Sequence, residues 1–149
     1  MFYGISLYLL GFNYFIVLES VGYKDILIDL FAMSVSFEED LNERDASLAR
    51  KMARIIGVEQ DYFLSQVKKR TIVPPEDLFQ KTVSSLKELQ WNEQILCMAW
   101  LCVVANYEGN ISEQDWRLIF NIYHKELPLP LREIIKTQNW LTRQIASMN

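Results

Sequence analysis

Apolar residues recur at helical spacing along most of this chain, and they divide it into a series of predicted helices. Between Asp25 and Ser36 apolar residues cover most of the helix circumference, which predicts a central, buried position for that segment. From Trp116 to Tyr123 they repeat at i, i+3, i+4 and i+7, which is typical of an amphipathic helix. Strand-type alternation and hairpin dipeptides are rare. The pattern therefore predicts an all-α domain.

Proline and glycine mark the ends of the predicted helices. Pro74 and Pro75 cannot continue a helix, and Pro75 makes a good first residue for the next one. The 149 residues suit one compact domain, 1–149. We expect a compact bundle of about seven to eight helices with an internal pseudo-repeat of two similar helical halves, roughly 23–72 and 91–147. Five further helices are expected at Asp45–Ile56, Glu59–Arg70, Pro75–Gln90, Glu93–Asn106 and Leu131–Met148.

The segment from Phe2 to Leu18 carries no charged residue and is nearly long enough to cross a membrane. It contains Ser6 and Asn13, however, and no Lys or Arg precedes it as a membrane span or a secretory signal would require. These features favour a buried first helix over a membrane-associated segment. Strand structure is a third alternative, because aromatic and β-branched residues are dense there.

An acidic stretch occurs twice, as FEEDLNERD at Phe37 to Asp45 and as YEGNISEQD at Tyr107 to Asp115. Each copy has the spacing of a helix start, with Asn42 or Ser112 as the capping residue and an acid three positions later. Ile111 before the second cap and Trp116 after it fit a hydrophobic staple. Structural capping alone therefore explains much of the duplication.

Capping leaves the acids at the start of each copy unexplained. Oxygen-bearing side chains at alternate positions are how a tight loop presents ligands to a hard cation such as Ca²⁺ or Mg²⁺. An EF-hand is not matched, because its glycine at the sixth position and its acid at the twelfth are missing. The candidate ligands for a divalent cation are Glu38, Asp40, Asp45, Glu108, Asn110 and Asp115.

Composition and charge argue against nucleic-acid binding and against catalysis. A net charge of −4 repels nucleic acid, and the one basic cluster, Lys68 to Arg70, falls where a helix is expected to end. His124 is the only histidine, so neither a histidine-based triad nor a typical zinc site can form. Cys97 and Cys102 match no metal or redox motif and are expected to be reduced core residues. The four tryptophans are expected to be core and staple residues.

A longer pattern surrounds the second acidic stretch. It comprises a small-residue helix ending near Ala105, an acid–glycine turn, the cap Ser112 with its acid, and a helix ending at a Leu-Pro-Leu phrase. In the first half, the same places are filled by the stretch FAMSVSFEEDLNERDASLARKMARIIGV. Over about Asp25 to Ile135 this arrangement resembles the tellurite-resistance TerB-like family.

The resemblance implies a cytoplasmic, all-helical domain whose acidic turns have been proposed to bind metal ions. It also implies a non-enzymatic role in bacterial stress-response assemblies, beside protein partners and in some cases membrane-associated complexes. The alternative is a helical protein–protein interaction or scaffold domain with no metal site. In that case the apolar amino terminus or an exposed helix face would bind a partner or a second copy of the chain.

Overall fold

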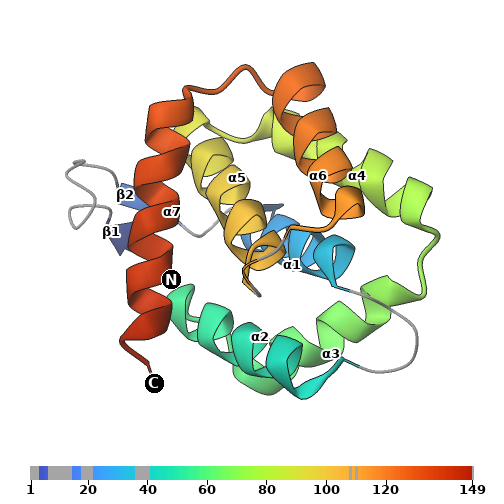
Figure 1. Ribbon diagram of the computed structural model, residues 1–149, viewed down its shortest axis with the longest axis vertical. Coiled ribbons are helices and arrows are strands. Elements are labelled where there is room, and N and C mark those ends of the chain that lie inside the picture. The colour runs from blue at the N-terminus through green and yellow to red at the C-terminus, as the bar shows by residue number, and fades with distance from the viewer. Residues whose placement is uncertain are drawn as a thin grey trace.

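The computed structural model describes residues 4–6, 15–17, 22–35, 41–107, 109 and 111–148. Within these ranges it forms a bundle of seven α-helices, and the predicted all-α fold class is confirmed (Figure 1). A π-helix, η2 (Asn121–Glu126), follows α6 directly. The α-helices are α1 (Gly22–Ser34), α2 (Glu43–Ile55), α3 (Gln60–Thr71), α4 (Pro75–Glu88), α5 (Trp91–Ala105), α6 (Glu113–Phe120) and α7 (Leu131–Ala146). The internal pseudo-repeat stays a prediction.

Two short strands lie within the uncharged amino-terminal segment. Strand β1 (Gly4–Ser6) pairs antiparallel with β2 (Phe15–Val17), and Ile5 lies opposite Ile16. The predicted buried helix over residues 2–18 is therefore wrong at 4–6 and 15–17, where aromatic and β-branched residues favour extended backbone. The other residues of that segment lie outside the described ranges. Among the described residues, no helix has both the length and the apolar character needed to cross a bilayer.

Helix α1 lies at the centre of the bundle and packs against α3, α4 and α5. The side chain of Phe31 is fully buried, and its ring meets that of Phe63 from α3 edge-on at a centroid distance of 5.5 Å. Trp100 of α5 is also fully buried, and its indole Nε1 donates to the Leu27 carbonyl of α1 at 3.0 Å. The apolar circumference of α1 is thus covered on several sides, as its sequence predicts.

One carboxylate is buried within this apolar packing. Asp29 of α1 is only 1% exposed, and its Oδ1 accepts from Nε of Arg70, in the last turn of α3, at 2.5 Å. Its Oδ2 lies 3.4 Å from the Thr82 hydroxyl and 3.7 Å from Nζ of Lys81, both on α4. Arg70 also reaches Asp25 at 3.5 Å. The Asp29 carboxylate therefore links three helices.

Asp29→Ala is expected to lower the free energy of unfolding by about 3–5 kcal/mol, because Arg70 would keep a buried charge without its main partner. Arg70→Met added to Asp29→Ala should recover part of the loss, since the guanidinium that has lost its main partner is then absent. Urea denaturation followed by circular dichroism measures both. The matched control is Glu113→Ala, which breaks an exposed ion pair with Arg117 and should change stability by less than about 0.5 kcal/mol. A loss for Asp29→Ala as small as the control's would contradict this account.

Candidate functional site

The two predicted helix starts are present at α2 and α6. The Asn42 side-chain oxygen accepts from the backbone N–H of Asp45 at 2.8 Å. The Ser112 hydroxyl oxygen accepts from the backbone N–H of Asp115 at 3.0 Å. In both helices the acid lies in the first turn, where it also interacts favourably with the helix dipole. The duplicated stretch is therefore confirmed as a duplicated N-cap.

The proposed cation site is described only at its two capping acids. Asp45 lies in the first turn of α2, and Asp115 lies in the first turn of α6. In the described part of the chain, no group of three or more His, Cys, Asp and Glu side chains is placed to hold a metal ion. A metal site at the acidic turns stays a prediction. The other candidate ligands, Glu38, Asp40, Glu108 and Asn110, lie outside the described residues.

The Asp115 side chain has a structural role at its helix start. Partial burial raises the pKa of Asp115 above its ordinary value, and a hydrogen bond with the Ser112 side chain opposes that shift. The Ser112 side chain thus contacts both the backbone N–H and the side chain of Asp115. These contacts give Asp115 a capping role at the start of α6.

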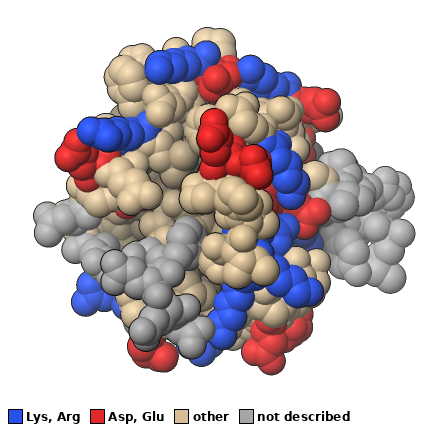
Figure 2. Space-filling model, turned by 90° about the vertical axis from the view of Figure 1, so that its right-hand side faces the viewer, with Lys and Arg blue, Asp and Glu red and all other residues tan. Residues whose placement is uncertain are grey.

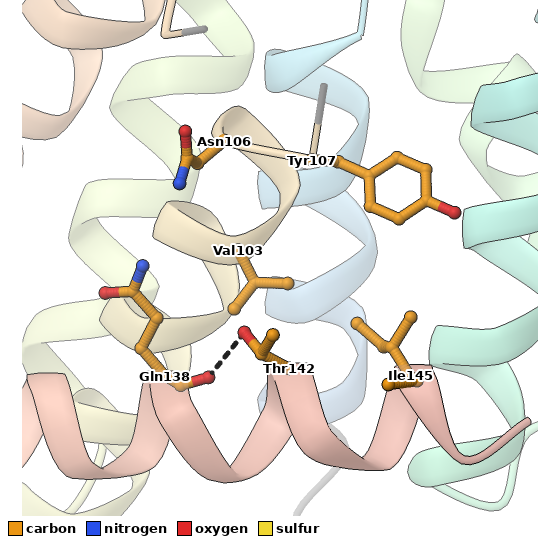
Figure 3. Close-up of a pocket in the computed structure, with 7 residues that line it drawn as sticks. Val103, Asn106, Tyr107, Gln138, Thr142 and Ile145 are labelled. Carbon is orange, nitrogen blue, oxygen red and sulfur yellow. Dashed lines mark hydrogen bonds between the residues drawn. The ribbon is translucent and has the colours of Figure 1, made fainter. Parts of the chain in front are cut away.

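A hollow of about 300 Å³ lies between the end of α5 and the second half of α7 (Figure 3). Buried Val103 and Ile145 supply its apolar wall. In Figure 3 the amides of Asn106 and Gln138 lie at one end, and the Thr142 hydroxyl donates to the Gln138 carbonyl at 2.9 Å. Its described lining holds no carboxylate, imidazole or thiol; the full set is Val103, Asn106, Tyr107, Gln138, Thr142, Ile145 and Ala146. The hollow can offer hydrogen bonds to a neutral group.

The most distinctive surface feature is a row of aromatic rings on α6 and η2. Ile119 is the only buried residue of α6, whereas Trp116 is 56% exposed and Phe120 is 51% exposed. His124, one turn further on, stacks against Phe120 with ring centroids 4.4 Å apart, and Tyr123 meets His124 edge-on at 5.2 Å. We call Trp116, Phe120, Tyr123 and His124 the aromatic face.

The π-helix sets the position of His124 on this face. The Leu127 N–H donates to the Ile122 carbonyl at 3.0 Å, five residues back, so the turn holds more residues than an α-helical turn. With this geometry Ile122 and Leu127 are buried while His124 remains exposed beside Phe120. Nζ of Lys87, on α4, pairs with the Glu126 carboxylate at 2.6 Å and holds the end of η2 against the bundle. Single π-turns of this kind occur frequently at functional sites.

The sequence predicts the apolar stripe of α6 but not its exposure. Of the stripe residues, Ile119 is buried and Tyr123 is half-buried, whereas the rings of Trp116 and Phe120 face solvent. The expectation that all four tryptophans are core or staple residues is wrong for Trp91, which is 45% exposed, and the staple role of Trp116 stays a prediction. Periodicity reveals that a helix has an apolar face. It cannot reveal whether another helix covers that face.

Both cysteines are free, and they are held in apolar surroundings, as expected from the sequence. Burial raises the pKa of the Cys102 thiol to about 11. Burial and the nearby Glu93 carboxylate raise the pKa of the Cys97 thiol still further. Both side chains are therefore thiols near neutral pH, and neither has the lowered pKa of a nucleophilic cysteine.

No protein-family model, curated protein or solved structure matches this chain. The resemblance to the tellurite-resistance TerB-like family therefore stays a prediction. The function of the chain has to be argued from its own surface.

Ser112→Ala is expected to lower the free energy of unfolding by about 1 kcal/mol, because the Asp115 N–H loses its side-chain acceptor. The loss should be equal in calcium, in magnesium and in chelator, as measured by urea denaturation. Ser84→Ala, at an exposed position inside α4, is the matched control and should change stability by less than about 0.5 kcal/mol. Thermal melts of Asp40→Ala in the same solutions test the cation hypothesis. A cation-dependent rise in Tm that Asp40→Ala abolishes would show that the acidic turn binds metal.

Alkylation by iodoacetamide at pH 8 should be slow for both cysteines in the folded chain and fast in urea, because only the thiolate reacts. The folded rate for Cys102 should rise about tenfold per pH unit until the pH approaches 11, its pKa. Peptide mass spectrometry separates the two sites. Cys102→Ser provides the control in which only Cys97 can react. A rate for Cys102 that levels off below pH 9 would contradict the raised pKa.

Proposed function

We propose that this chain is a non-enzymatic helical domain that binds a protein partner through the aromatic face of α6 and η2. The observation that carries the proposal is the half-exposed pair of rings, Trp116 and Phe120, one helical turn apart. Large aromatic side chains are enriched at the centres of protein interfaces, and Trp is among the commonest hot-spot residues. A pair of such rings on one short helix favours recognition by another protein.

The energetics of covering these rings support the proposal. A Trp or Phe side chain buries about 150–250 Å² when fully enclosed, and about half of each ring here still faces water. At about 25 cal/mol per Å², covering the remainder contributes roughly 2–3 kcal/mol per ring before the cost of association. Both rings lie on a regular α-helix that begins with a capped first turn. Such a face needs little ordering when a partner binds.

The groups around the rings match the rim of a protein interface. Glu113 and Arg117 form an exposed ion pair at 2.6 Å on the same helix. Polar and charged groups around an aromatic centre are the usual anatomy of such an interface. The right-hand side of Figure 1, seen in Figure 2, shows Lys and Arg side chains intermixed with Asp and Glu and with uncharged surface. A mixed surface of this kind favours a protein partner over nucleic acid.

Other exposed apolar side chains lie on different helices. Ile72, at the end of α3, is 84% exposed, and Leu131 and Ile135 of α7 are about half exposed. Tyr62 of α3, at 49%, has an exposure close to that of Phe120. Leu131 and Ile135 also lie one turn apart but are aliphatic, whereas a singly exposed apolar residue such as Tyr62 is normal on a protein surface. Tyr62 therefore serves as a matched reference position for tests of the aromatic face.

The stress-response role with divalent cations, implied by the TerB-like resemblance, is kept as a prediction. It depends on acids at the start of each duplicated stretch, outside the described residues, and the capping geometry at Asn42 and Ser112 does not require it. An interaction domain and a cation-responsive module are compatible on this chain. The aromatic face and the acidic turns can therefore be tested separately.

A photo-crosslinking amino acid in place of Arg117, which is exposed beside the rings, should give a discrete covalent adduct with a protein in the native cell. The adduct should be lost when Trp116→Ser and Phe120→Ser are added, because the partner loses its aromatic anchors. Gel electrophoresis and mass spectrometry of the adduct provide the measurement.

The same crosslinker in place of Tyr62 is the matched control and should give no such adduct. Circular dichroism of each variant establishes that it is folded. Identical adducts at positions 62 and 117, or adducts unaffected by the two serine substitutions, would overturn the proposed function.

A further inference from the structure

We infer that the partner of the aromatic face is a second copy of this chain, with the α6–η2 segments of the two copies packed antiparallel across a two-fold axis. The inference rests on the proposed function and names the partner for the same surface. It is carried by the order of chemical groups along the segment, which is complementary to its own reverse.

The segment has acids in its first turn, rings in the middle and bases in its last turn. Two further charges lie along it, Arg117, which pairs with Glu113, and Glu126, which pairs with Lys87. Glu113 lies in the first turn of α6, with 80% of its side chain exposed. Trp116 and Phe120 follow one turn apart. His124 and Lys125 lie in the last turn of η2, and both are exposed. The exposed Glu113 and Lys125 thus carry opposite charges near the two ends of the segment.

A two-fold axis makes this order self-complementary. In a contact of this symmetry, residue i of one copy meets residue j of the other, and j meets i. An axis passing near Leu118 pairs Trp116 of each copy with Phe120 of the other. The same axis brings Glu113 of each copy near His124 and Lys125 of the other. The same contact therefore covers the rings and pairs the opposite charges.

The antiparallel direction follows from the same charges. In a parallel pair, Glu113 would meet its own counterpart, and the two basic ends would also meet. In the antiparallel pair, the positive amino-terminal end of each helix also lies beside the negative carboxyl-terminal end of the other. Both effects favour the reversed direction, and neither depends on a third protein.

The dimer is expected to be weak and reversible. Four half-exposed rings bury roughly 300–500 Å² between them, well below the 1,200 Å² or more of a standard stable interface. The net charge of −4 on each copy also opposes contact at long range. We therefore expect a Kd in the range of about 10–100 µM and rapid exchange between monomer and dimer.

Sedimentation velocity of the full chain tests the inference. The concentrations run from about 1 to 500 µM, which spans the expected range of Kd. The weight-average mass should rise from that of one chain, 17.6 kDa, toward twice that value. Trp116→Ser should weaken the association by at least about tenfold, because each copy loses one of the two paired rings. Tyr62→Ser, which removes a comparably exposed ring from α3, is its control and should leave the mass unchanged.

A charge exchange tests the antiparallel direction. Glu113→Lys alone and Lys125→Glu alone should each weaken the dimer by about three- to tenfold, because each places like charges opposite one another. The two together should restore most of the affinity, since the ends then exchange roles. Glu76→Lys, at an exposed position on α4, changes the net charge as Glu113→Lys does and should leave the dimer intact. Circular dichroism establishes folding of every variant.

A mass of one chain at every concentration would overturn the inference, as would a dimer that Trp116→Ser leaves unchanged. The inference would also be overturned if the variant with both charge changes dimerised no more tightly than either single variant. Failure here is distinct from failure of the proposed function. A chain that stays monomeric but crosslinks through position 117 to a different protein keeps the interaction domain and loses only the second copy.

Discussion

The buried contact between Asp29 and Arg70 constrains how the central helices of this bundle pack. A carboxylate almost removed from water is costly unless charged or hydrogen-bonding groups surround it. The observed arrangement of α1, α3 and α4 brings Arg70, Lys81 and Thr82 to it together. Apolar side chains such as Leu27 and Phe31 could tolerate small shifts along their neighbours. The carboxylate cannot, so it fixes the register in which the apolar residues pack.

Local sequence signals account for most of the helices, because the atoms that create each signal are close in the chain. Pro75 predicts the start of α4, and the caps Asn42 and Ser112 predict the starts of α2 and α6; the structure has all three. The Asp29–Arg70 contact joins residues 41 positions apart, and no local pattern indicates which base meets which acid. The only sign in the sequence is a single acid within the apolar run of α1. The strands β1 and β2 were predictable only as one of several alternatives for an uncharged segment.

The candidate site shows the same division between local and long-range information. Its aromatic content, its helical spacing and its capped first turn can be predicted from the sequence. Its exposure is not, because Trp116 and Phe120 have the same periodicity as residues that pack inward. The exposure of these two rings depends on how α6 packs against α5 and how η2 packs against α4. That packing depends on contacts such as the ion pair of Lys87 with Glu126. Function in this chain therefore appears at a surface that only the assembled bundle defines.

The π-turn of η2 allows the length of this segment to change while the packing of the core stays the same. Ile119 before it and Leu127 after it are both buried, and the wide turn between them takes up an extra residue. A homologous chain with one residue fewer could span the same two anchors as an ordinary α-helix. Its core would be unchanged, while the ring next to Phe120 would turn away. Insertion and deletion, as well as substitution, can therefore remodel this surface during evolution without cost to the fold.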